Sequence, residues 1–183
     1  MNNVSVVIPI LNERPSVLRK LKEKLESYGA EVIIVDDGSK RPYSDSIKHG
    51  SNFGYGSAIL TGIKQSTRPL ILTMDGDNQH RPEDAKNLWE VWKMLGNCDL
   101  LIGTRRLKGE KWHRMIGRKI LNMIASFIVF KWLQDLNSGM RLFRRDIVLG
   151  YAPILCKTYS FTTSLTISML ADNYRVEYFP IQV

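Results

Sequence analysis

The chain alternates nearly continuous apolar runs with segments of helical periodicity, and this alternation constrains its fold more than any other feature. The run VSVVIPI at 4–10 is apolar at almost every position, as expected of a parallel strand that is covered by helices on both faces. Further runs of this kind follow at 31–37, 68–75 and 99–104. Each of them is predicted to be a buried strand.

Helices are predicted between these strands. Leu18, Leu21 and Leu25 recur at helical spacing, and the segment GSAILTGIKQ begins a second helix. A third helix is predicted over 82–95, with a proline in its first turn, where proline is tolerated. The alternation predicts one α/β domain over residues 1–183, with a mostly parallel central sheet and helices on both faces.

The composition is that of a soluble globular protein, with 44% hydrophobic and 24% charged residues. No secretory leader is expected, because no basic segment precedes the first apolar run. The longest apolar run, MIASFIVF at 123–130, is shorter than the roughly 20 residues of a membrane span. Cys98 and Cys156 lie far apart and predict no disulfide framework, which suits a reducing, cytoplasmic compartment.

The net charge of +8 is concentrated in one segment, between residues 105 and 119. Its basic residues are Arg105, Arg106, Lys108, Lys111, Arg114, Arg118 and Lys119. Such a cluster indicates an anionic partner or a solvated face, so nucleic acid, phosphate ligands and acidic lipids are all compatible with it. Because no nucleic-acid recognition motif occurs in the sequence, no nucleic-acid partner is predicted.

Polar residues follow each of the predicted strands. They are Asn12 and Glu13, then Asp36 and Asp37, then Asp75 and Asp77, and finally Arg105 and Arg106. Ligands of parallel α/β sheets bind beyond the carboxyl ends of the strands, so a functional site is predicted at this edge.

The segment DGDNQH places Asp75, Asp77 and Gln79 at short spacing. A simple turn is one interpretation, because Asp-Gly is a common turn dipeptide. A calcium loop of the EF-hand type is excluded, since His80 stands where that loop requires glycine. The preferred interpretation is a Mg²⁺ or Mn²⁺ site shared with a phosphate ligand, because these oxygen ligands suit such cations.

The other motifs have simpler alternatives. VDDGS at 35–39 could cap a helix or form a turn, and the glycines of NFGYGSA at 52–58 could serve only a turn. No phosphate-binding Walker A motif occurs. His49, His80 and His113 lack metal-ligand spacing, so they are predicted to be surface residues or residues that support a ligand. The predicted helix at 116–133 could be core or could lie on a membrane surface.

Together these motifs resemble the family 2 glycosyltransferases of the GT-A fold. The segments that carry the resemblance, in order, are VIPILNE (7–13), VDDGS (35–39), NFGYGSA (52–58), MDGDNQH (74–80), GTRR (103–106), GRK (117–119), DLNSGMRLFRRD (135–146) and YFPI (178–181). The pattern is most like the dolichyl-phosphate and polyprenyl-phosphate mannosyltransferase branch. It covers nearly the whole chain.

The resemblance implies roles for individual residues. Nucleotide-binding residues would be Pro9, Leu11, Glu13, Val35, Asp37, Asp75, Gly76, Asp77 and Arg105. Metal ligands would be Asp75, Asp77 and Gln79. Catalysis would depend on Asp77, Arg105 and Arg118, and the two arginines would face the donor diphosphate and the acceptor phosphate. Asp135, Ser138 and Gly139 would lie beside the acceptor pocket.

The chain departs from the family pattern in three places. Leu11 stands where relatives often have tyrosine, which removes a ring that could stack on the base. The segment 39–52 is short, so a helix and a strand are expected to be abbreviated there. Relatives continue into an Arg-x-x-Gly-x-Ser-Lys lid, whereas this sequence ends at Val183, so that lid is expected to be missing.

The class of acceptor is predicted from the absence of an acidic residue that could act as a catalytic base. Relatives that transfer sugars to hydroxyls place an acidic base on the helix near 160–171, but residues 151–170 contain no Asp or Glu. A phosphate acceptor is already ionised and needs cations instead. The predicted activity is therefore metal-dependent, inverting hexosyl transfer from a GDP- or UDP-sugar to polyprenyl phosphate, at the cytoplasmic face of a membrane with peripheral contact. Alternatives are transfer to a saccharide hydroxyl and a nucleotide-sugar-binding pseudoenzyme.

Overall fold

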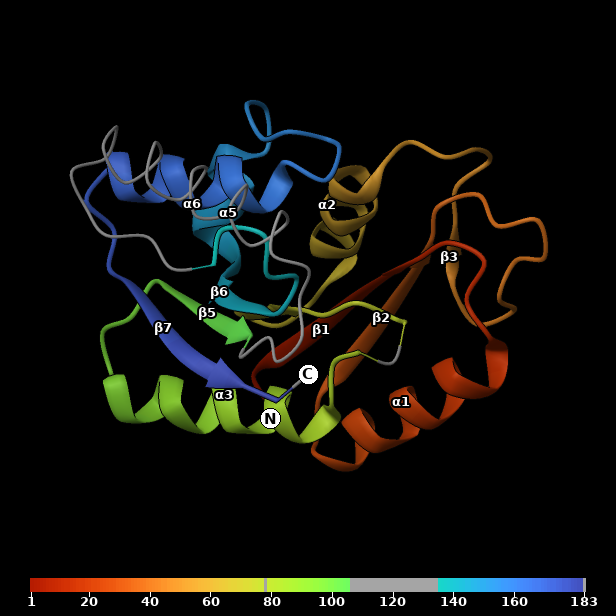
Figure 1. Ribbon diagram of the computed structural model, residues 1–183, viewed down its shortest axis with the longest axis horizontal. Coiled ribbons are helices and arrows are strands. Elements are labelled where there is room, and N and C mark those ends of the chain that lie inside the picture. The colour runs from red at the N-terminus through yellow and green to blue at the C-terminus, as the bar shows by residue number, and fades with distance from the viewer. Residues whose placement is uncertain (78, 106–134, 183) are drawn as a thin grey trace, which may run out of the picture.

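The computed structural model describes residues 1–77, 79–105 and 135–182 of the chain (Figure 1). The strands are β1 (Val4–Ile10), β2 (Glu31–Asp36), β3 (Ile47–Lys48), β4 (Leu70–Thr73), β5 (Leu100–Arg105), β6 (Arg141–Arg144) and β7 (Val176–Ile181). The helices are α1 (Pro15–Ser27), α2 (Tyr55–Gln65), α3 (Pro82–Leu95), α5 (Arg145–Tyr151) and α6 (Phe161–Ala171). The predicted strands and helices of the described N-terminal half are therefore all present.

The strands form one seven-stranded sheet in the order β3-β2-β1-β4-β6-β5-β7. Strand β1 pairs in parallel with β2 and β4, and β5 pairs in parallel with β7. Strand β6 is inserted antiparallel between β4 and β5. The carboxyl ends of β2, β1, β4 and β5 therefore meet at one edge of the sheet, and β6 begins there. The prediction of an α/β domain with a mostly parallel sheet is confirmed.

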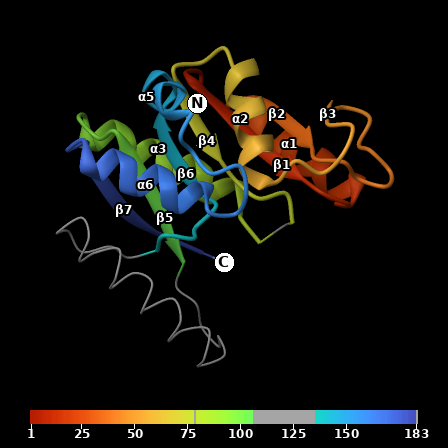
Figure 2. The same cartoon turned by 90° about the horizontal axis from the view of Figure 1, so that it is seen from above.

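Helices cover both faces of the sheet (Figures 1 and 2). Helices α1 and α3 lie on one face, and α2, α5 and α6 lie on the other. Successive side chains of a strand point to opposite faces, so β1 contributes to both cores. Ile8 packs in the cluster that contains Leu18 and Leu88, whereas Val7 belongs to the cluster of Ile59 and Phe143. This double covering explains why β1 is apolar at every position except Ser5.

The segment between β2 and α2 is abbreviated, as predicted. It contains the two-residue strand β3 and, for the rest, turns and bends. The buried carboxylate of Asp36 accepts hydrogen bonds from the backbone N–H groups of Ser39 (2.8 Å) and Tyr43 (2.9 Å). These bonds give the loop a fixed path away from the end of β2.

Within the described ranges, no helix combines the length and the hydropathy that a membrane crossing requires. The helix predicted at 116–133 and the basic cluster after Arg105 lie outside the described residues.

Candidate functional site

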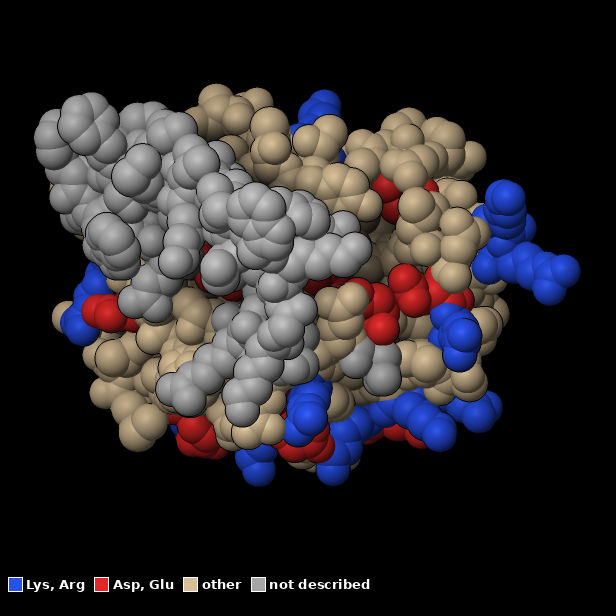
Figure 3. All heavy atoms as spheres, in the orientation of Figure 1, with Lys and Arg blue, Asp and Glu red and all other residues tan. Residues whose placement is uncertain are grey.

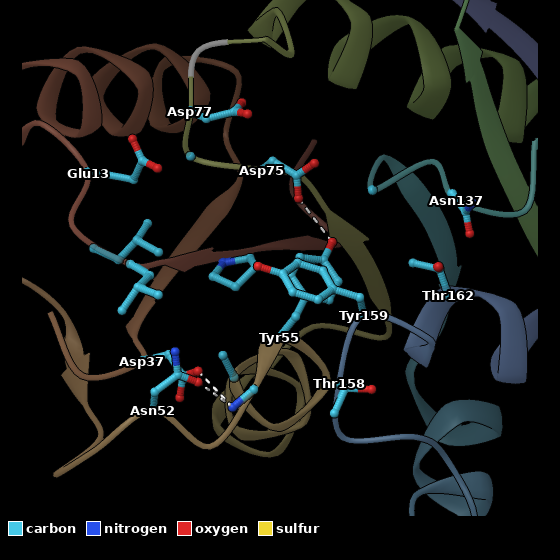
Figure 4. Close-up of a pocket in the computed structure, with 17 residues that line it drawn as sticks. Glu13, Asp37, Asn52, Tyr55, Asp75, Asp77, Asn137, Thr158, Tyr159 and Thr162 are labelled. Carbon is cyan, nitrogen blue, oxygen red and sulfur yellow. Dashed lines mark hydrogen bonds between the residues drawn. The ribbon is translucent and has the colours of Figure 1, made fainter. Parts of the chain in front are cut away.

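A cavity of about 530 Å³ opens at the sheet edge where β1, β2 and β4 end (Figure 4). Its lining residues come from strand ends, from the start of α2 and from the segments that precede β6 and α6. They are Pro9, Ile10, Leu11, Glu13, Asp37, Asn52, Gly54, Tyr55, Ala58, Asp75, Gly76, Asp77, Asn137, Gly139, Thr158, Tyr159 and Thr162. The predicted position of the site, beyond the carboxyl ends of the parallel strands, matches this cavity.

One end of the cavity gathers negative charge. Glu13 follows β1, and Asp75 and Asp77 follow β4, with Glu13 and Asp77 lying near each other in Figure 4. Burial raises the pKa of Glu13, and the charges of Asp77 and Asp75 raise it further against the opposing effect of Arg14. Among the described residues that line the cavity, none is Lys or Arg. The acidic band in the middle of the face in Figure 3 contrasts with the basic side chains along its lower edge.

This charge distribution fits a bound divalent cation. Carboxylates held near one another are stabilised when a cation lies between them, and hard oxygen ligands suit Mg²⁺ and Mn²⁺. In the described part of the chain, no group of three His, Cys, Asp or Glu side chains is placed to hold a metal ion by itself. The carboxylates of Asp75 and Asp77 would fit a cation that is also bound by a ligand's phosphates and by water.

The three metal ligands implied by the resemblance differ in how exposed they are. The Asp77 side chain is exposed, and its Oδ1 accepts a hydrogen bond of 3.0 Å from the backbone N–H of Gln79. Gln79 is itself exposed and is not among the cavity-lining residues. Asp75 is only 32% exposed. Asp75 is thus the fixed carboxylate of the pair, and Asp77 faces solvent.

Asp75 is held from several directions. Its backbone N–H donates to Nδ1 of His80 at 3.1 Å, and its Oδ1 accepts a hydrogen bond of 3.0 Å from the Tyr55 hydroxyl. His80 is buried, so of the two predicted alternatives the surface position is wrong for it, whereas His49 is partly exposed. The alternative prediction, a residue that supports a ligand, describes how His80 contacts Asp75.

Asp37 lies at the opposite end of the cavity, after β2. Its carboxylate accepts hydrogen bonds from the N–H groups of Gly54 (2.8 Å) and Phe53 (3.0 Å), and it contacts Nδ1 of His49 at 2.7 Å. Nε2 of His49 in turn lies 2.9 Å from Oγ1 of Thr61. The carboxylate of Asp37, labelled in Figure 4, therefore fixes the VDDGS segment to the start of α2.

The third wall of the cavity is polar but carries no carboxylate of its own. Asn137 precedes β6, and Thr158, Tyr159 and Thr162 surround the start of α6. These residues reach the cavity because β6 runs antiparallel, so that its beginning, rather than its end, lies at the functional edge. Figure 4 places Asn137 and Thr162 across the cavity from Glu13.

Gly54 and Gly56 of the NFGYGSA motif allow the segment 156–158 of this wall to pack closely against them; this contact is called the glycine seat. The N–H of Ser57 donates to the carbonyl of Lys157 at 3.0 Å. A Cβ atom at Gly56 would lie 2.3 Å from the carbonyl oxygen of Cys156, and one at Gly54, whose φ is +99°, would lie 2.6 Å from that of Lys157. Only residues without a Cβ allow such a close approach. The motif therefore has a packing role beyond a turn.

A buried arginine fixes the segment that precedes β6. Arg141 is fully buried, and its guanidinium donates to the carbonyls of Leu136 (2.6 Å) and Ser138 (2.8 Å). It also donates to the hydroxyl of Thr166 in α6 at 2.5 Å. Arg141 thereby links the two segments that supply the third wall.

The structure brings most of the predicted site residues together. Those that line the cavity are Pro9, Leu11, Glu13, Asp37, Asp75, Gly76, Asp77 and Gly139. Val35 is fully buried in β2 and does not line it, and Asp135 and Ser138 are buried beside it. The backbone of Arg105 ends β5, but its side chain, like the whole of Arg118, lies outside the described residues.

Sequence reasoning missed part of the lining. The missed residues that carry polar side chains are Asn52, Tyr55, Asn137, Thr158, Tyr159 and Thr162. Asn52 and Tyr55 lie inside the NFGYGSA motif, so the motif was itself a signal for them. The residues near α6 carry no pattern that could have identified them.

Comparison with known proteins supports this fold. Three crystal structures of glucosyl-3-phosphoglycerate synthase from Mycobacterium tuberculosis superpose on the whole chain, each with 16% sequence identity. They are the complexes with Mg²⁺ and uridine diphosphate (TM-score 0.80, 70% of that chain covered), with Mn²⁺ and UDP-glucose (0.79, 70%) and with Mn²⁺, uridine diphosphate and glucosyl-3-phosphoglycerate (0.77, 71%). At this identity the likeness shows a shared fold. Residues 5–150 match the family described as Glycosyl transferase family 2, and the chain belongs to that family.

Proposed function

We propose that the chain catalyses metal-dependent, inverting transfer of a hexosyl group from a nucleotide-diphosphate sugar to polyprenyl phosphate. The observation that carries this proposal is the asymmetry of the cavity. Three carboxylates, from Glu13, Asp75 and Asp77, gather at one end, and the fourth, that of Asp37, is bound by backbone N–H groups at the opposite end. The wall formed by Asn137, Thr158 and Thr162 is polar and uncharged. A donor diphosphate with its cation suits the end with three carboxylates, and an acceptor that needs no base suits the uncharged wall.

The donor half of the proposal rests on family membership and on the carboxylates. Asp75 and Asp77, with Gln79, would hold Mg²⁺ or Mn²⁺, which would offset the charge of the leaving diphosphate. The structures of glucosyl-3-phosphoglycerate synthase contain these cations together with uridine diphosphate or its glucose conjugate. By extension, a UDP-sugar is the first donor to test, and a GDP-sugar is the second.

The acceptor half rests on the absence of a base. Helix α6 presents Thr162 to the cavity, and no Asp or Glu occurs between residues 151 and 170. A hydroxyl acceptor must lose a proton to a base, whereas a phosphate is already ionised. Thr162, Thr158 and Asn137 can donate hydrogen bonds to phosphate oxygens, and Arg105 and Arg118 would supply the positive charge.

The lipid character of the acceptor is supported at the level of the sequence. The basic segment 105–119 is followed within a few residues by the apolar run at 123–130. A basic segment adjoining an apolar one suits peripheral contact with an anionic membrane surface, where a lipid phosphate is presented. The resemblance to the polyprenyl-phosphate branch points to the same acceptor class.

The chain's own residues would then act by positioning and by charge. Pro9, Leu11 and Asp37 would bind the nucleoside against the ends of β1 and β2. The N–H donors that fix Asp37 keep that wall in place, so the donor would be oriented before reaction rather than during it. The acceptor phosphate would attack the anomeric carbon from the side of Thr162, opposite the leaving diphosphate, which gives inversion.

The test is a transfer assay with three classes of acceptor. UDP-glucose or GDP-mannose, radiolabelled in the sugar, is supplied with Mn²⁺ and with undecaprenyl phosphate in anionic vesicles, with 3-phosphoglycerate, or with free saccharides. We expect label in the lipid fraction. Label only in phosphoglycerate, which carries a hydroxyl as well as a phosphate, or only in saccharide would contradict transfer to polyprenyl phosphate.

Asp77→Asn provides the control for the site. Because it removes one charge and keeps the shape, it should abolish metal-dependent nucleotide binding without unfolding the protein. Undiminished binding would exclude the metal assignment. Nucleotide binding by the wild-type chain with no transfer to any acceptor would favour the pseudoenzyme alternative.

A further inference from the structure

Of the three carboxylates at the acidic end of the cavity, those of Glu13, Asp75 and Asp77, that of Asp75 has contacts from three other segments of the chain. Its Oδ1 accepts the hydrogen bond from Tyr55, and its Oδ2 lies 3.8 Å from Nδ1 of His80. The backbone of Gly139 passes so near that a Cβ atom there would lie 2.4 Å from Oδ2. The orientation of this carboxylate is therefore set by its neighbours before any ligand arrives.

Tyr55 is itself held by a second aromatic ring. The rings of Tyr55 and Tyr159 stack with centroids 5.7 Å apart and an interplanar angle of 18°. Tyr159 is 81% exposed and lines the cavity, so its ring covers Tyr55 on the solvent side (Figure 4). Offset stacked pairs at this distance are favourable. The stack fixes the ring that carries the hydroxyl bound to Asp75.

The two tyrosines come from different walls of the cavity. Tyr55 begins α2, while Tyr159 belongs to the segment before α6 that is seated on Gly54 and Gly56. A continuous chain of contacts therefore runs from the wall near α6, through Tyr159 and Tyr55, to the carboxylate at the end of β4.

We infer that Tyr55 is a positioning residue for the metal carboxylate Asp75, and that Tyr159 keeps Tyr55 in place. By donating to Oδ1, the Tyr55 hydroxyl would hold the carboxylate of Asp75 in one orientation, so that this ligand needs less ordering when a cation binds. This inference rests on the metal site proposed above. It adds that the wall near α6, which faces the acceptor, controls how well the donor's cation is held.

The experiment measures Mn²⁺ affinity, by electron paramagnetic resonance, in the presence of saturating uridine diphosphate. Partners that orient a metal ligand typically contribute about 10–100-fold to metal affinity. Tyr55→Phe removes only the hydroxyl and keeps the ring, so we expect Mn²⁺ binding to weaken by about tenfold. Tyr159→Ala removes the stack, and we expect about threefold weaker binding.

The chain offers a matched control. The hydroxyl of Tyr151 donates to the carboxylate of Asp172, away from the cavity-lining residues. Tyr151→Phe therefore makes the same chemical change at another Tyr–Asp pair and should leave Mn²⁺ affinity unchanged. In the double variant, Tyr159→Ala should cost nothing further once Tyr55→Phe is present, because its effect passes through the lost hydroxyl.

The outcomes separate this inference from the proposal on which it rests. Weakened binding in Asp77→Asn and Tyr55→Phe, with Tyr151→Phe unchanged, supports it. Loss of binding in Asp77→Asn alone, with Tyr55→Phe equal to wild type, overturns the positioning role and keeps the metal site. Wild-type affinity in Asp77→Asn overturns both. An equal loss in Tyr151→Phe and Tyr55→Phe overturns the specific role of Tyr55.

Discussion

The ring of His80 accepts, at Nδ1, a 3.1 Å hydrogen bond from the backbone N–H of Asp75. His80 is 3% exposed, so His80→Ala would leave this donor unsatisfied beside a cavity. We expect the free energy of unfolding to fall by about 2–3 kcal/mol, as measured by urea denaturation. His80→Asn is the control, because an amide oxygen can accept the same bond and should restore part of the stability. Equal losses in both variants would contradict this account.

The seat formed by Gly56 predicts a steric effect. In Gly56→Ala, the new methyl group would meet the carbonyl of Cys156 at 2.3 Å and Cβ of Phe161 at 2.9 Å. We expect the segment before α6 to be displaced, with a loss of about 1–3 kcal/mol and weaker acceptor binding.

The control for that seat is Gly150→Ala, in α5, where a Cβ would meet nothing within 4 Å. There the substitution should be neutral or should stabilise by about 0.5–1 kcal/mol, because alanine favours helix. Thermal unfolding of the two variants tests the contrast. A destabilised Gly150→Ala protein with an unaffected Gly56→Ala protein would refute it.

Glu13 predicts a dependence of stability on pH. Burial, followed by the charges of Asp77 and Asp75, raises the pKa of this carboxyl in the folded protein. The folded state then binds the proton more tightly than the unfolded state does. The contribution of Glu13 to stability is complete below the unfolded pKa of about 4.3 and is lost as the pH rises through the raised folded pKa.

Glu13→Gln should therefore raise the melting temperature of the metal-free protein at pH 7–8, by about 1–3 °C, and should have no effect near pH 4. Mn²⁺ with uridine diphosphate should cancel the gain, because a cation offsets the ionised carboxylate. Glu23→Gln, an exposed change on α1, serves as the control. Equal shifts in the two variants would exclude charge repulsion in the cavity as the cause.

Arg141 predicts the largest loss of stability. Arg141→Met would leave the carbonyls of Leu136 and Ser138 and the hydroxyl of Thr166 without this donor in a buried region. We expect a loss of about 3 kcal/mol or more in urea unfolding. Arg144→Met, in the same strand, removes ion pairs with Asp99 and Asp146 from a side chain that is 51% exposed, and should cost no more than about 1 kcal/mol.

Strands β1, β2, β4 and β5 were predictable because they form nearly continuous apolar runs, whereas the parallel strands β3 and β7, which are more exposed, were not predicted. Strand β1 is apolar at every position except Ser5, and the repeat of Leu18, Leu21 and Leu25 matches the face of α1 that packs on it. Strand β6 was not predicted. Its four residues begin and end with arginine, and Arg141 is buried through hydrogen bonds that a hydropathy pattern does not encode.

In the candidate site, too, some residues could be predicted from the sequence and others could not. Residues at the ends of parallel strands, such as Glu13, Asp37 and Asp75, were predicted because strand direction places them at one edge. Thr158 and Thr162 were not, because their position depends on the close packing of the segment before α6 against Gly54 and Gly56. Long-range packing of this kind leaves no local periodicity in the sequence.

Because helices cover both faces of the sheet, much of the hydrophobic core lies on the face opposite the walls of the candidate site. Apart from strand-end residues, the cavity is built by segments on the face of α2 and α6, whereas α1 and α3 bury their apolar sides against the opposite face. Substitutions that improve packing beneath the sheet, for instance around Leu21 or Ala85, are thus a route to a more heat-resistant protein in which the residues that line the cavity keep their original sequence.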